Sequence, residues 1–101
     1  MRIELTRSGG LAGLRQAAAV DDAALPPQER DELLRLAAAA DLWSLPERLE
    51  ASRAEPDRFR YRIAVDDGAR RRELSVAEEA MPEALRPLVR WLEARAHPAR
   101  R

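Results

Sequence analysis

The chain has 101 residues, and its 18 basic and 18 acidic side chains cancel to a formal net charge of zero at pH 7. This length is enough for one domain with a single core. The balanced charge excludes a global field that would attract nucleic acid or anionic lipid, so we expect no nucleic-acid partner. Cysteine is absent, which excludes disulfides and thiolate chemistry.

Nothing in the sequence suggests a membrane segment or an export signal. Residues 1–4 lack an apolar stretch of signal-peptide length, and no segment approaches the roughly 20 apolar residues of a membrane span. The lack of cysteine suits a reducing compartment. We therefore expect a cytoplasmic monomer with no membrane partner, built as a single domain over residues 1–96 with a frayed tail over 97–101.

The first two elements are predicted to be strands. Residues 2–7 alternate in polarity, with Ile3 and Leu5 on one side, and this period of two is typical of a strand with one wet face. Residues 14–20 follow a glycine-rich segment and are predicted to pair back as a second strand, although their alanines are poor strand formers.

A helix is predicted next. Over 27–40 the apolar residues recur at the i, i+3, i+4 and i+7 spacing of one helical face, and Pro27 is accepted in a first helical turn. Residues 41–46, which include Trp43, are too apolar for a solvated linker and are predicted to fold down over one end of the core. Residues 47–57 are charged and are predicted to form an exposed loop.

The strongest strand signal lies in the second half of the chain. Basic and apolar residues alternate from Arg58 to Val65, residues 66–69 supply a hairpin turn, and residues 70–76 return as the partner strand. The last element has helical spacing. Because Pro87 cannot donate to the carbonyl four residues back, the regular part of this helix is predicted to begin near Arg86.

The predicted order is therefore β-β-α-β-β-α, which indicates an α+β fold. We expect a four-stranded antiparallel sheet made of two hairpins, with two helices packed on one face. The other face is predicted to show mostly charged side chains to water, namely Glu4, Arg58, Arg60, Arg62, Arg71 and Glu73.

The residues do not support catalysis. The single histidine, His97, has no candidate partner nearby for metal binding or proton transfer, and a zinc site would lack ligands. The serines have no identifiable base, and the adjacent carboxylate pairs are explained by turns and helix starts. We expect no enzyme activity, no metal and no cofactor.

Two binding functions are disfavoured. The glycine-rich segment lacks both the Lys-Ser/Thr pair and the following helix of a phosphate loop. The arginines at 58, 60 and 62 form a stripe, but Phe59 and Tyr61 between them are expected to point toward the core. Proteins that bind single strands need aromatic rings beside the charge, so a solvated sheet face explains the stripe better than RNA binding.

The glycines of the chain are concentrated between its first two strands. Three of the four, Gly9, Gly10 and Gly13, fall within five residues and enclose one large apolar side chain, Leu11. Such a cluster marks backbone that bends sharply or approaches another group closely. On the residues alone, the segment is either a long hairpin turn with an incidental leucine or a loop that offers Leu11 to a partner.

The opening of the chain carries the motif Ile3-x-Leu5-x-Arg7-Ser8-Gly9-Gly10-Leu11-Ala12-Gly13-Leu14. On this motif the chain resembles the emfourin family, small bacterial inhibitors of protealysin-type, thermolysin-like metallopeptidases. The resemblance covers nearly the whole chain apart from the 47–56 loop and the tail. The further matching segments are Val20-Asp21, Ala24-Leu25-Pro26-Pro27, Ala40-Asp41-Leu42-Trp43-x-Leu45-Pro46, Asp57-Arg58-Phe59-x-Tyr61 and Leu85-Arg86-Pro87-Leu88-x-x-Trp91-Leu92.

The resemblance implies a protein inhibitor whose loop 7–14 blocks the cleft of such a zinc peptidase sterically. Leu11 would fill the apolar subsite beside the catalytic zinc, while the glycines would let the main chain approach the enzyme. Ser8 would hydrogen-bond in the cleft, and Arg7 would contribute charge at its rim. The expected protease-binding residues are Arg7, Ser8, Gly9, Gly10, Leu11, Ala12, Gly13 and Leu14.

Two alternatives stay open. The chain could instead be a non-inhibitory interaction module, such as an adaptor or chaperone for another partner. Within an inhibitor, Asp21 or Asp22 could reach the zinc of the peptidase, although nothing distinguishes these residues from ordinary turn residues.

Overall fold

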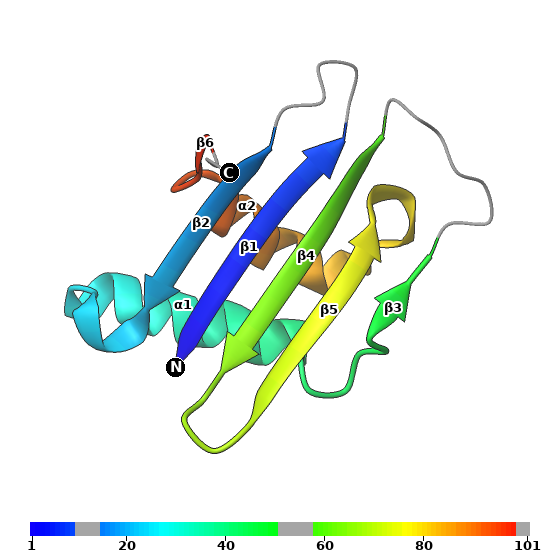
Figure 1. Cartoon of the computed structure of the whole chain (residues 1–101). Coiled ribbons are helices and arrows are strands. Elements are labelled where there is room, and N and C mark those ends of the chain that lie inside the picture. The colour runs from blue at the N-terminus through cyan, green and yellow to red at the C-terminus, as the bar shows by residue number, and fades with distance from the viewer. Residues whose placement is uncertain (10–14, 51–57, 99–101) are drawn as a thin grey trace.

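The computed structural model describes residues 1–9, 15–50 and 58–98. Within them, two α-helices lie behind a six-stranded sheet (Figure 1). The elements in chain order are β1 (Arg2–Gly9), β2 (Gln16–Asp21), α1 (Pro27–Ala40), β3 (Arg48–Leu49), β4 (Phe59–Asp66), β5 (Arg71–Ala77), α2 (Arg86–Glu93) and β6 (His97–Pro98). The expected α+β class is confirmed.

The strands are arranged in the order β3-β5-β4-β1-β2-β6. The two predicted hairpins, β1–β2 and β4–β5, form the centre of the sheet, and β1 pairs with β4 in antiparallel fashion to join them. These four strands match the prediction, but the predicted strand count is wrong. A short β3 pairs in parallel with β5, and a short β6 pairs with β2, so the sheet is mixed.

The two additional strands lie where a loop and a tail were expected. Arg48–Leu49 belongs to the predicted exposed loop over 47–57, yet it aligns with Ser75 and Val76. His97–Pro98 belongs to the predicted frayed tail, yet it pairs with Gln16 and Ala17. A strand of two residues has no periodicity, so its pairing depends only on which neighbour the fold brings near.

Helix α1 has the predicted bounds. Its N-terminal Pro27 has no N–H to leave unsatisfied, and the chain leaves the helix through Asp41, which adopts a left-handed conformation with φ 53°. Leu33, Ala37 and Ala40 are buried on its sheet-facing side. Trp43 in the following segment is partly buried against the core, as predicted.

Helix α2 begins at Arg86, as predicted, after a 3₁₀ turn over Glu83–Leu85. Pro87 lies in its first turn, where the missing N–H costs no helical hydrogen bond. Beyond its end, Arg95 stacks on the ring of Trp91 at 3.5 Å and its Nη2 donates to Glu29 Oε1 of α1 at 2.6 Å. This contact ties the two helices together.

The core lies between the sheet and the helices. Side chains from both layers are almost completely buried, and burial of each contributes about 1.5–3 kcal/mol. The sheet supplies Ile3, Leu5, Ile63, Val65, Leu74 and Val76, and the helical segments supply Leu33, Leu85, Leu88 and Leu92.

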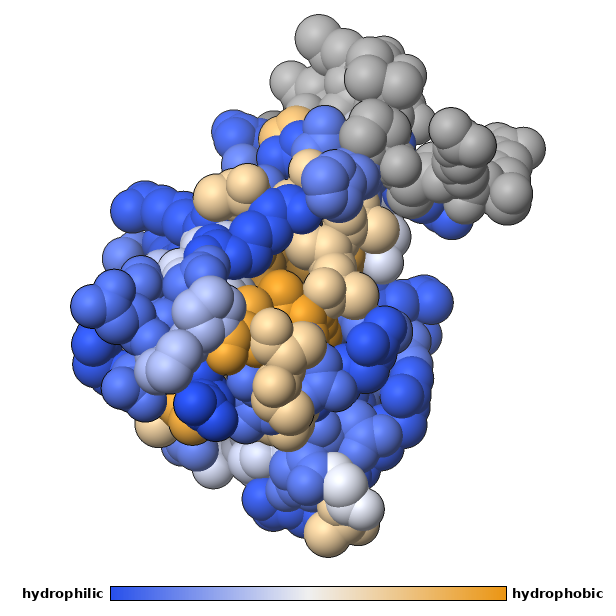
Figure 2. Space-filling model, turned by 90° about the vertical axis from the view of Figure 1, so that its left-hand side faces the viewer, coloured by the Kyte–Doolittle hydropathy of each residue, from blue (hydrophilic) through white to orange (hydrophobic). Residues whose placement is uncertain are grey.

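The outer surface is mostly hydrophilic. Seen from the β2 edge, a narrow apolar seam follows the line where the sheet and helix layers meet, with polar residues on both sides (Figure 2). Among the described residues, Leu34 is the one large apolar side chain classed as exposed, at 39%. Both α-helices in this part of the chain fall short of the length and apolar character that crossing a bilayer requires.

Candidate interaction site

The glycine-rich segment is attached at one end of the sheet. The β1–β2 register aligns Arg7 with Gln16, and the β1–β4 register aligns Gly9 with Phe59. The residues that flank segments 10–14 and 51–57 therefore meet at the same end of the sheet, as Figure 1 shows. Strand β1 is paired on both sides up to Arg7, so the stem of the glycine-rich segment is held by two ladders.

Gly9 is required by both its backbone and its surroundings. Its φ is +95°, a conformation that residues with a Cβ rarely adopt. A Cβ built on Gly9 would lie 2.7 Å from the carbonyl oxygen of Arg58, which is closer than such contacts normally allow. The glycine lets β1 stay against β4 at the point where the chain leaves the sheet.

Arg7 anchors the same stem to helix α2. Its side chain lies on the helix side of the sheet, where Nη1 donates to Glu93 Oε2 at 2.6 Å and the guanidinium stacks over the ring of Phe59 at 4.4 Å. The hydroxyl of Tyr61 donates to the same Glu93 oxygen at 3.5 Å. Glu78 accepts the backbone N–H of Phe59 at 3.0 Å, which fixes the start of β4.

Tyr61 in this anchor is strongly perturbed. Burial, together with the negative charges of Glu93 and Glu78, raises the pKa of Tyr61 to about 12 from its usual value of 10. The phenol therefore remains a neutral hydrogen-bond donor to Glu93 throughout the physiological range. The side chains of this anchor bond to or stack on one another, so the anchor stabilises the fold. We call it the helix-side anchor and define it by Arg7, Phe59, Tyr61, Glu78 and Glu93.

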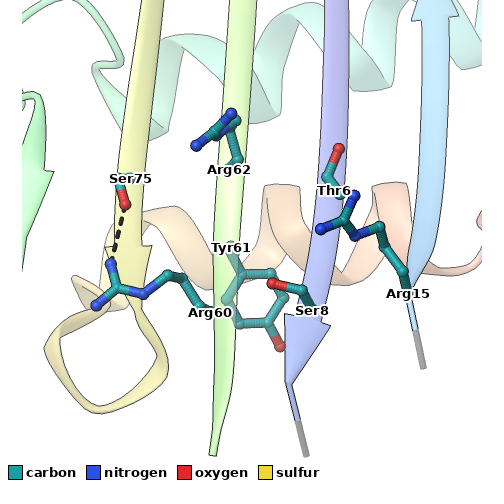
Figure 3. A pocket seen from close by; sticks show the side chains of 7 residues that line it. All are labelled: Thr6, Ser8, Arg15, Arg60, Tyr61, Arg62 and Ser75. Atoms are coloured by element: carbon teal, nitrogen blue, oxygen red, sulfur yellow. Dashed lines mark hydrogen bonds between the residues drawn. The ribbon is translucent and has the colours of Figure 1, made fainter. Parts of the chain in front are cut away.

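The opposite face of the same strands carries a shallow polar depression of about 220 Å³ (Figure 3). Tyr61 lies at its base, with its ring on the helix side of the sheet. We call this depression the arginine hollow and define it by the residues that surround it, Thr6, Ser8, Arg15, Arg60, Arg62 and Ser75.

The arginine hollow is built from cross-strand neighbours. Thr6 is aligned with Arg62, and Arg62 with Ser75. Ser8 is aligned with Arg60 in the next row toward the glycine-rich segment. Short hydroxyl side chains thus lie between long guanidinium side chains, and this alternation in length produces the depression.

One carboxylate already binds at the margin of the hollow. Glu50 accepts from Arg60 through both oxygens, Oε1 from Nη1 at 3.0 Å and Oε2 from Nη2 at 2.7 Å, and Arg60 also donates to Ser75 Oγ at 3.0 Å. The hydrogen bonds from Arg60 lower the pKa of the Glu50 carboxyl below its usual value. Both side chains of this pair are about half exposed.

The structure places only part of the predicted site. Arg7 lies in the helix-side anchor, Ser8 lines the arginine hollow, and Gly9 makes the close approach to β4. Residues 10–14, which include the proposed contact residue Leu11, lie outside the described residues. The sequence analysis assigned no role to Arg15 or to the grouping of Thr6 with Arg62, because the pairing of β1 with β4 is not visible in a strand pattern.

No metal site is indicated in the part of the chain that the structure describes, where no group of three or more His, Cys, Asp or Glu residues is suitably clustered. The geometry describes a small α+β protein that holds the two ends of a glycine-rich segment rigidly at the end of a sheet.

The comparisons with known proteins identify the family. The sequence profile of the emfourin family matches residues 5–93, and the chain belongs to that family. This assignment confirms the resemblance found in the sequence and the expectation that the protein is not an enzyme.

One solved structure is similar. Emfourin (M4in) from Serratia proteamaculans, described as an M4 family peptidase inhibitor, is 24% identical to this chain. The match covers 95% of this chain and 89% of the other, with a TM-score of 0.48. No curated protein matches the sequence.

Proposed function

We propose that this protein inhibits a thermolysin-like, protealysin-type zinc metallopeptidase of the M4 family, by placing residues 7–14 in the active-site cleft. Membership of the emfourin family supports the inhibitor class. The inhibition is steric and reversible, and the inhibitor needs no cofactor. The protein acts as a monomer in the cytoplasm, where it protects the cell that makes the peptidase.

The observation that carries this proposal is the rigid attachment of the loop stem. Arg7 is paired through its backbone with β2 and β4 and through its side chain with Glu93. Gly9 is held against the carbonyl of Arg58. A segment whose ends are already fixed loses less conformational entropy on binding, and such preorganisation raises affinity.

Leu11 is the proposed anchor in the apolar subsite of the peptidase, with Ser8, Ala12, Leu14 and the neighbouring backbone lining the contact. Gly10 and Gly13 let the main chain approach the walls of the cleft. Arg7, which was expected to contribute charge at the rim of the cleft, also has a supporting role in this proposal. Its guanidinium is held by Glu93 and Phe59, so it supports the loop from the helix side.

The test is inhibition of a purified protealysin-type peptidase by the wild type, by Leu11→Asp and by Leu34→Asp. Loss of one buried leucine contact costs about 1.5–3 kcal/mol, which corresponds to a rise of roughly ten- to a hundredfold in the inhibition constant. Leu34→Asp introduces the same change at an exposed position on α1 and is expected to inhibit like the wild type. An unchanged inhibition constant for Leu11→Asp, with the fold intact by circular dichroism, would exclude the loop as the anchor.

A further inference from the structure

We propose that the arginine hollow is a second contact site, which binds a carboxylate side chain of the peptidase beside its cleft. This inference rests on the proposed function, because the occupant belongs to the peptidase. The described residues that surround the site lie on the sheet face opposite the helices (Figure 3).

The composition of the hollow matches a carboxylate. Arginine presents a planar fork of N–H donors that matches the two oxygens of a carboxylate. The hydroxyls of Thr6, Ser8 and Ser75 lie between the guanidinium groups and supply further donors to an anion. The hydroxyls of Thr6 and Ser8 make no hydrogen bond within the described residues, so their donors are available.

Within the described residues, the charges of the hollow are incompletely neutralised. Arg15 has no ion-pair partner within the described part of the chain, and Figure 3 shows it extending from the start of β2 toward Thr6. Arg62 meets Glu73 only at 3.4 Å, and both side chains are well exposed, at 69% and 49%. Ion pairs with this exposure contribute little, so Arg62 can exchange its partner at small cost.

Glu50 demonstrates the chemistry within the same structure. It binds the Arg60 fork through both oxygens at the margin of the hollow. A carboxylate from a partner would occupy the adjacent position between Arg15 and Arg62. Arg60 is paired with Glu50 and Arg62 with Glu73, whereas Arg15 makes no ion pair within the described residues, so Arg15 is the guanidinium that a partner carboxylate would bind first.

The position of the hollow links it to the loop. Ser8 precedes the glycine-rich segment and Arg15 follows it, so both flank residues 10–14 while lining the hollow. A peptidase that holds the loop in its cleft therefore has its rim next to these two residues. A carboxylate on that rim would meet a positive surface, and such complementarity contributes to association rate and specificity.

Nucleic acid fits the hollow less well. Among the described residues that line it, Tyr61 is the aromatic one, and its ring lies on the other face of the sheet. Base stacking therefore has no platform there.

The test compares a hollow variant with a matched control. Arg15→Gln/Arg62→Gln removes two charges from the hollow, while Arg2→Gln/Arg71→Gln removes two charges from the far end of the sheet, where Arg2 and Arg71 are both aligned with Asp66. Inhibition constants against a purified protealysin-type peptidase are measured at low and high salt, with thermal unfolding as a check on the fold. Binding of a single-stranded oligonucleotide is measured in parallel.

The hollow variant is expected to raise the inhibition constant by roughly ten- to a hundredfold, because it loses charged hydrogen bonds to the peptidase. The control variant is expected to raise the inhibition constant by less than about threefold, because distant charges are screened. The difference should shrink at high salt. Equal inhibition by wild type and hollow variant would overturn the carboxylate site while leaving the inhibitor proposal intact. No inhibition by the wild type would overturn both. Oligonucleotide binding that only the hollow variant loses would overturn the carboxylate site in favour of nucleic acid.

Discussion

Gly9 gives the most direct test of how the loop stem is held. We predict that Gly9→Ala destabilises the protein substantially, because the new methyl group would lie 2.7 Å from a backbone oxygen, that of Arg58. A backbone oxygen cannot rotate away as the far end of a long side chain can. Either β1 moves away from β4 at this point or the φ of +95° changes, and both loosen the stem.

The magnitude has two parts. Placing a residue with a Cβ in the left-handed region costs about 1–2 kcal/mol, and forcing an extra methyl group into a packed site costs about 1–3 kcal/mol. Gly68 separates the two parts, because its φ is +93° while a Cβ there would meet nothing within 4 Å. Gly68→Ala should therefore lose only the conformational part.

The assay is thermal or urea unfolding of the wild type, Gly9→Ala and Gly68→Ala. Gly9→Ala should be less stable than Gly68→Ala by about 1–3 kcal/mol, and for a domain of this size each kcal/mol lowers the midpoint by about 4–8 °C. Gly9→Ala should also weaken inhibition, while Gly68→Ala should leave it unchanged. Equal unfolding midpoints for the two variants would refute the close contact with Arg58.

Two further predictions concern the helix-side anchor. Tyr61 is the only tyrosine, so the tyrosinate absorbance should titrate near pH 12 in the folded protein and near pH 10 after unfolding. Because the pKa of Tyr61 is raised in the folded state, the contribution of Tyr61 to stability is complete below pH 10 and is lost as the pH rises toward 12. Tyr61→Phe should remove this decline in stability. A folded titration near 10 would contradict this. In a double-mutant cycle on the free energy of unfolding, Arg7→Met and Glu93→Gln should show a coupling energy of about 1–2 kcal/mol, because both side chains are only about a quarter exposed. A coupling energy near zero would mean that Arg7 does not anchor the stem.

Much of the fold follows from local patterns. The bounds of α1, the turn around Gly68 and the start of α2 near Arg86 are each determined by residues within a few positions of one another. Such signals are short-range, so a single sequence contains them. Strands β3 and β6 have no comparable signal, because two residues cannot show a period and their partners lie far away in the chain.

The candidate site was less predictable because it depends on pairs that are distant in sequence. Arg7 occupies an odd position in β1, like Ile3 and Leu5, and its side chain lies on their side of the sheet, although the sequence analysis assigned it only to the rim of the peptidase cleft. Its partner Glu93 lies 86 residues further on, and no local pattern could identify it. Arg60 and Arg62 of the predicted arginine stripe lie on the open face, as expected. Their grouping with Arg15 in one depression could not be predicted, because it depends on the β1–β4 register.

Three consecutive residues at the end of β1 serve three different structural purposes. Arg7 points toward the helices and binds Glu93, Ser8 points to the open face and lines the arginine hollow, and Gly9 is fixed by the close approach of Arg58. Because strand side chains alternate, the chain cannot shift by one residue without exchanging the first two environments. The register of β1 therefore positions both the loop stem and the hollow, and a change in either should be felt at the other.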